Sequence, residues 1–344
     1  FLGQSLSFRT DLNARENFFD TAERRDSILK LARLISYNAS RNIAASGLLK
    51  FTTVTTTEDI IDSNGKNLSQ QIITWNDPAN TDYLEQFVSI LNASMQSPQK
   101  IGKPIASKLL NKIKTDLYRF NIPSNTLPIT RFSQSVEGQR LNFEIVSADI
   151  TNKDMIYESS PHLGNYGFLY RNDGKGNGSN NTGYFMYFKQ GALGSTDINF
   201  PASLPNNYNI LNVININETD VWLFELDQNN NLSTEWLQLE ATAGTNVIYN
   251  SLAKNIRKIF AVNSNDLDQI QLEFGDGVFS EIPVGPFVSY VRSSNGLTYV
   301  IDPTEMQGIS ISFSYVSRIG RIETLTVGLE LQTPVSNAQQ REPL

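Results

Sequence analysis

The chain has 344 residues, of which 40% are hydrophobic and 18% are charged, and its formal net charge is −7 at pH 7. This length allows two or three domains with sizeable cores, and the hydrophobic content excludes a disordered tail. The acidic balance argues against nucleic acid as the main partner, no apolar stretch is long enough for a membrane span, and the lack of cysteine excludes disulfides and thiolate sites.

The first predicted element is a helix that begins at a capping box formed by Asp20 and Glu23. Ile28, Leu31 and Ile35 then recur at helical spacing, so one face of this helix must be buried. Because the first residue is not Met, we expect the sequence to be a piece of a longer protein.

The pattern then changes to period two between residues 48 and 76, where an Asn-Gly pair ending at Gly65 predicts a β-hairpin inserted between helices. A second helix is predicted at 82–95. A third is predicted at 104–119, because Pro104 fits a first helical turn and apolar residues follow at a spacing of four.

Beyond residue 128 the sequence favours short antiparallel strands, most clearly at 309–316, where apolar residues alternate with serines. The predicted class is therefore α+β, with a helical N-terminal part and a larger β-rich C-terminal part. We predict a helical domain at 1–127 and one or more β-rich domains at 128–344, divided near 200–215.

A glycine-rich segment, Gly174–Gly178, has two functional interpretations that fail on chemistry. A phosphate loop would end in Gly-Lys-Ser/Thr and lead into a helix, but a predicted strand follows here. A calcium loop would need an oxygen ligand where Lys175 stands and a glutamate where Tyr184 stands. We interpret the segment as a flexible hairpin loop.

Other candidate chemistry is equally weak. His162 is the only histidine, so a zinc site or a Ser-His-Asp triad has little support. Trp75, Trp222 and Trp236 could line a sugar-binding groove, but core positions are more common. Asp276, between two glycines, is best read as a turn residue. We therefore predict no enzyme activity and no catalytic, cofactor-binding or metal-binding residues.

Five segments, in order along the chain, resemble the baseplate wedge protein of T-even-like contractile-tailed bacteriophages, a member of the J-like baseplate family. They cover nearly the whole chain, although Ser36-Tyr-Asn-Ala39 departs from the Gly-Tyr-X-Pro that is usual in the family. The segments are Asn17–Ala22 with Arg25–Ala32, Asp62–Asn67, Asn217–Trp222, Leu272–Phe279 followed by Ile282–Gly285, and Arg292–Gly296.

The resemblance implies a structural subunit of the virion, assembled in the host cytoplasm, that forms a ring around the hub and tail tube. The implied partners are a second copy of the chain, other wedge proteins including a helical one, and hub and tube neighbours. In this role the ring transmits the rearrangement that triggers sheath contraction. The alternative is a receptor- or glycan-binding tail protein.

We also predict a contact surface on the first helix, because its apolar stripe is wide for one edge of a small domain. An equal alternative is that these side chains only fill the core of this chain. The residues of the predicted interface are Phe18, Phe19, Ile28, Leu31 and Ile35.

Overall fold

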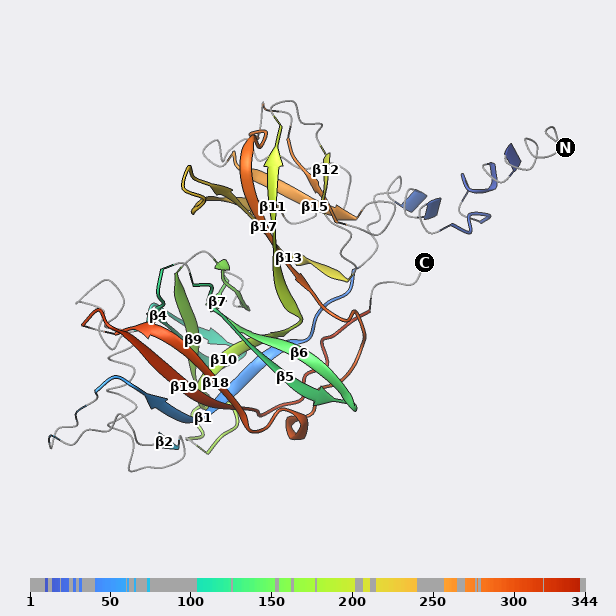
Figure 1. Ribbon diagram of the computed structural model, residues 1–344. Helices are drawn as coiled ribbons and strands as arrows, with labels where there is room; N and C mark the ends of the chain where they lie inside the picture. Colours follow the sequence, from blue (N-terminus) through green and yellow to red (C-terminus); the bar gives the residue numbers. More distant parts are fainter. Residues whose placement is uncertain are drawn as a thin grey trace. The chain divides into compact units, whose positions relative to one another are not determined.

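The computed structural model describes pieces of residues 10–32, residues 41–59, isolated positions between 61 and 74, and most of residues 104–201, 207–239 and 257–340. Of the described chain, 57% is strand and 5% is helical. The predicted α+β class with a helical N-terminal part is therefore wrong, and the described fold is mostly β (Figure 1).

The chain divides into two compact units, each built from separated segments. Unit 1 comprises residues 1–43, 193–298 and 339–344, and unit 2 comprises residues 44–192 and 299–338. The polypeptide passes from one unit to the other four times, at 43/44, 192/193, 298/299 and 338/339.

Unit 2 contains a ten-stranded sheet in the order β18-β19-β1-β10-β9-β4-β3, to which β2 adds on β1, β6 on β10, and β5 on β6. A separate two-stranded sheet pairs β7 with β8. The strands of unit 2 are β1 (Ser46–Thr56), β2 (Ile73–Thr74), β3 (Ala106–Leu110), β4 (Ile113–Asn121), β5 (Ile129–Val136), β6 (Gln139–Val146), β7 (Ala148–Ile150), β8 (Ile156–Glu158), β9 (Asn165–Asn172), β10 (Gly183–Gln190), β18 (Ile309–Val316) and β19 (Ile322–Leu331).

An aromatic core fills one side of this sheet. The rings of Phe120, Tyr166 and Phe313 pack against one another, with centroids 5.1 to 5.5 Å apart for each pair. Strands β4, β9 and β18 supply these three side chains, so the core joins segments that are far apart in the sequence. A smaller apolar cluster around Leu117 and Phe185 lies under the β7–β8 hairpin.

Unit 1 contains a seven-stranded sheet in the order β11-β17-β13-β14-β15-β16-β12. Trp236 is buried in its core, where Phe274 and Phe287 each meet the indole edge to face at 5.7 Å. The strands are β11 (Ala192–Phe200), β12 (Asn207–Ile210), β13 (Ile216–Leu226), β14 (Leu232–Gln238), β15 (Ile259–Ser264), β16 (Ile270–Glu273) and β17 (Gly285–Ser293).

The predicted helix at 104–119 is wrong, because this segment forms the β3–β4 hairpin. A spacing of four places apolar residues on one side of a helix, but four is also a multiple of the strand period of two. Asn111 and Lys112 have positive φ angles of 47° and 68°, which end any helix and make a two-residue hairpin turn.

The predicted helix at 20–35 is also not seen as such in the described residues, which show only short helical turns. Asp20 was predicted to accept the hydrogen bond of the Glu23 backbone. In the structure the Glu16 carboxylate accepts hydrogen bonds from the backbone N–H groups of Glu23 and Arg24. The predicted helix at 82–95 lies outside the described residues.

The predicted hairpin at 48–76 is present only in part. β1 pairs with β2 at Thr53 and Val54, but β1 is also an inner strand between β10 and β19 (Figure 1). The strand predicted at 309–316 coincides with β18.

Candidate functional site: a protein interface

The N-terminal segment contains the residues predicted to form an interface. Phe18 leaves 65% of its surface exposed, whereas Ile28 and Leu31 are half-buried. Phe19 and Ile35 lie outside the described residues. The described side chains therefore include one large accessible aromatic ring, and the predicted interface stays a prediction.

Local hydrogen bonds shape the chain around Phe18. The carbonyl oxygen of Phe18 accepts from the N–H groups of Thr21 and Ala22, and the Thr21 hydroxyl donates to the carbonyl of Arg15. These bonds close a turn that leaves the Phe18 ring facing solvent. An exposed ring on an ordered turn suits contact with another protein better than it suits a core.

The glycine-rich loop between β9 and β10 is ordered by one carboxylate. Asp173 accepts hydrogen bonds from the hydroxyls of Ser179 (2.6 Å) and Thr182 (2.8 Å) and from the Lys175 N–H. These bonds, the one from Ser179 above all, lower the pKa of Asp173 to about 2. The loop joins β9 to β10 as the predicted hairpin loop, and its acidic group holds hydrogen bonds within the loop.

The turn after β16 is described only in part. Phe274 is buried in the core of unit 1, and the carbonyl oxygen of Gly277 accepts a hydrogen bond from the Arg257 guanidinium at 3.1 Å. Gly277 has a φ of +83°, which agrees with the predicted turn. Asp276 itself lies outside the described residues, as do His162 and Trp75.

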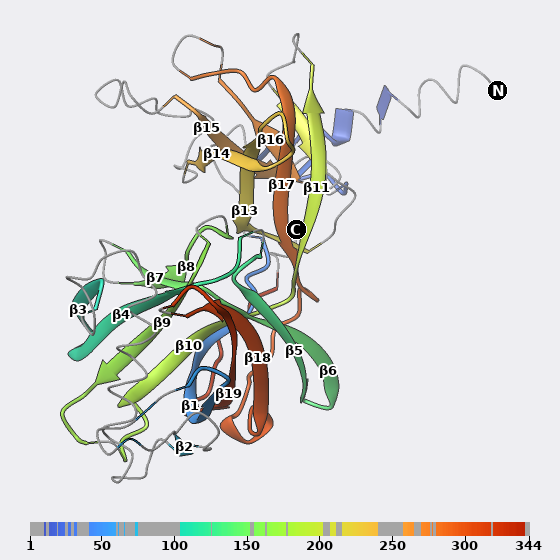
Figure 2. The ribbon, with the colours of Figure 1, turned by 60° about the vertical axis from the view of Figure 1, so that its left-hand side comes forward.

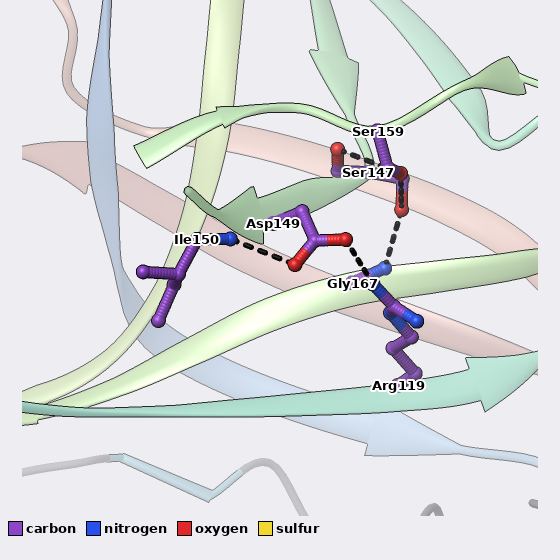
Figure 3. A network of polar contacts seen from close by, with 6 residues as sticks. All are labelled: Arg119, Ser147, Asp149, Ile150, Ser159 and Gly167. Carbon is purple, nitrogen blue, oxygen red and sulfur yellow. Dashed lines mark hydrogen bonds and ion pairs between the residues drawn. The ribbon is translucent and has the colours of Figure 1, made fainter. Parts of the chain in front are cut away.

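A buried polar network fixes the β7–β8 hairpin to the large sheet (Figure 3). The Ser147 hydroxyl accepts from the Gly167 N–H at 2.9 Å and from the Ser159 hydroxyl at 2.7 Å. Next to it, the Arg119 guanidinium pairs with the Asp149 carboxylate. The network therefore ties β7 to β4 and β9 at two points.

The backbone of β9 approaches β7 so closely that only glycine fits at position 167. A Cβ atom added there would lie 2.1 Å from the carbonyl oxygen of Ala148. Ser147 and Ser159, which are hydrogen-bonded to each other, are both buried. This arrangement cannot be predicted from a single sequence, because it depends on contacts between residues that are far apart in the chain.

Several buried acidic residues are held in ion pairs. Glu144 pairs with Arg131 at 2.9 Å, and Glu158 pairs with Lys189 at 3.4 Å. Both carboxylates are almost completely buried, so their position suits the cohesion of the fold rather than attack on a large substrate. Among the described residues, no group of three or more His, Cys, Asp or Glu is placed to hold a metal ion.

Large apolar side chains stand exposed at hairpin ends, a feature that sequence periodicity missed. Leu109 in β3 is 66% exposed, and Ile319 and Ile322 at the end of the β18–β19 hairpin are 67% and 66% exposed. Strand patterns predict which face of a strand is buried but not which strands end a sheet. These positions are candidate contact points for other proteins.

Comparison with known families places the chain in a group defined by sequence alone. The model of a domain of unknown function, DUF8360, matches residues 47–334, which is most of the chain. The chain belongs to the DUF8360 family. The match covers residues 193–298 of unit 1 and nearly all of unit 2.

No curated protein matches this DUF8360 chain. Within the described part of the structure, helices long and apolar enough to cross a membrane were not found.

Proposed function

We propose that this DUF8360 protein is a structural subunit of the baseplate wedge of a contractile-tailed bacteriophage. The observation that carries the proposal is the exposure of Leu109, Ile319 and Ile322 in unit 2, whose buried Glu144 and Glu158 are held in ion pairs. Such a surface suits permanent contacts with other proteins. The five sequence segments that resemble the wedge family support the same role.

In this role the β-rich body transmits force rather than catalysing a reaction. A ring of wedges must hold one geometry before host contact and move as a body afterwards. Buried networks such as the one around Ser147 resist local deformation, because each broken bond leaves a buried polar group without a partner. The proposed partners are a second copy, a helical wedge protein, and hub and tube neighbours.

The alternative of a glycan-binding tail protein receives no support from the described tryptophans. Trp236 is buried between phenylalanines, and Trp222 is half-buried with the Arg292 guanidinium 5.9 Å from its ring centroid. Neither provides an open aromatic surface of the kind that stacks on sugars.

Co-expression with wedge and hub proteins of a contractile-tailed bacteriophage tests the proposal. Size-exclusion chromatography with light scattering should show a hetero-complex of defined mass that contains this chain. Phe18→Asp should weaken that complex, because a charge on an exposed contact ring opposes burial. Asn17→Asp is the matched control, since it adds the same charge at an exposed neighbouring residue.

The proposal fails if the folded chain stays separate from every neighbouring tail protein. If a complex forms and both variants assemble as the unmodified chain does, the wedge role survives but Phe18 is not part of the contact.

A further inference from the structure

β3 is the last strand of its sheet, among the strands that the structure describes. Figure 2 shows it beside β4, with which it forms a short hairpin. Asn111 and Lys112 form the two-residue turn, so Leu110 and Ile113 face each other as a hydrogen-bonded pair. Hydrogen bonds to β4 along one side therefore keep β3 extended.

The backbone groups on the other side of β3 belong to alternate residues. In an antiparallel pair, residues that bond to the partner strand alternate with residues that direct their N–H and C=O groups away from it. Counting back from Leu110 gives Ser107 and Leu109 as the outward-directed residues. Both side chains are exposed, and Leu109 provides a large apolar side chain next to these backbone groups.

The β3–β4 hairpin is locally basic on a protein that is acidic overall. Lys108, Lys112 and Lys114 lie within seven residues of one another, whereas the whole chain has a net charge of −7. Lys112 is exposed, and Lys114 leaves 63% of its side chain exposed while pairing with Asp116. A segment added beside β3 would meet an excess of positive charge.

We propose that β3 binds an extended acidic segment of another protein as an added strand. Backbone hydrogen bonds to Ser107 and Leu109 supply the affinity, and an apolar residue of the added strand covers Leu109. The lysines select acidic side chains in the same segment. The edge of β3, the exposed Leu109 and the local charge favour this occupant whether or not the protein is a baseplate subunit.

A second copy of this chain is a poorer occupant of the same edge. Two β3 strands paired about a twofold axis would bring the lysines of both hairpins together, and like charges along a sheet edge oppose such pairing. Self-pairing is therefore one of the results that would overturn the proposal.

Peptide binding to the full chain tests the inference. The probe is a short peptide of alternating Glu and Val with blocked ends, compared with a matched peptide of alternating Lys and Val. Fluorescence anisotropy should show saturable binding of the acidic peptide that weakens as salt is added.

Leu109→Pro is the variant aimed at the edge. It removes an outward N–H while leaving the pairing with β4 in place, and its affinity for the acidic peptide should fall at least about tenfold. Leu109→Ala keeps the N–H and loses only the apolar contact, so its affinity should fall less. Circular dichroism and the melting temperature show whether each variant is folded.

A second variant keeps the test decisive if proline disrupts the hairpin. Lys112→Gln combined with Lys114→Gln should weaken binding of the acidic peptide by about threefold without changing the backbone. Three results would overturn the proposal: no saturable binding of the acidic peptide, equal binding of the Lys-Val peptide, or self-association of the free chain that Leu109→Pro abolishes.

Discussion

Two hairpins of unit 2, β7–β8 and β3–β4, differ in how they are attached to the rest of the fold. The β7–β8 hairpin is anchored through Ser147, Ser159 and Gly167, and its polar groups turn inward to the network of Figure 3. Among the strands that the structure describes, β3 of the β3–β4 hairpin pairs only with β4, and its Leu109 is exposed. The β7–β8 hairpin is therefore anchored by buried polar groups, although Met155 and Tyr157 remain exposed on it, whereas β3 is the strand proposed to bind a partner.

We expect the fold to tolerate substitutions in β3 but not at the residues that anchor β7. Substitutions at the two places should therefore affect different measurements, namely unfolding free energy for β7 and partner binding for β3.

The largest expected effect is that of Gly167→Ala. The new Cβ would overlap the Ala148 carbonyl oxygen, so β7 must move away from β9, at a cost of about 3 kcal/mol. Urea unfolding should show this loss. Gly178→Ala is the control, because a Cβ there meets nothing within 4 Å and its stability should hardly change.

Ser147→Ala should cost somewhat less. It leaves the buried N–H of Gly167 without an acceptor, which destabilises the protein by about 2 kcal/mol. A loss of stability no larger than that of an exposed serine, such as Ser310→Ala in β18, would show that the network does not anchor the hairpin.

Asp173→Asn should have a smaller, pH-dependent effect. The pKa of Asp173 is lowered from 3.8 to about 2, so its stabilisation is complete above the ordinary pKa and disappears as the pH falls toward 2. The difference in melting temperature between wild type and variant should therefore shrink over that interval. A difference that stays constant across it would contradict the assignment.

Leu109→Ala should leave folding almost unchanged. The side chain is 66% exposed, so the expected loss is below about 0.5 kcal/mol. A large loss would mean that this leucine supports the fold, and it would remove the contrast between the two hairpins.

Strands with one buried face could be predicted from the sequence. β18 was predicted with its observed bounds because Ile309, Ile311 and Tyr315 are buried on one face while the serines alternate with them on the other. The same rule failed for Ile105, Leu109, Ile113 and Leu117. Their spacing fits a helix and a hairpin equally, and only the positive φ angles of Asn111 and Lys112 decide between the two.

The candidate site could be predicted only in part. Phe18 was singled out from the sequence, and the structure leaves its ring exposed. The Ser147 network and the position of β3 at the end of its sheet depend on contacts between distant segments, which a single sequence does not reveal. Alternating patterns specify the faces of strands, but strand order comes from the whole fold.

Hydrogen exchange measured at single residues tests whether the outer edge of β3 is open for an added strand. In the free protein, the amides of Ser107 and Leu109 should exchange rapidly while those of Lys108 and Leu110 are protected by β4. Adding the Glu-Val peptide should slow exchange at Ser107 and Leu109 alone. Equal protection of all four amides in the free protein, or no change on adding the peptide, would contradict an edge that is open for a partner.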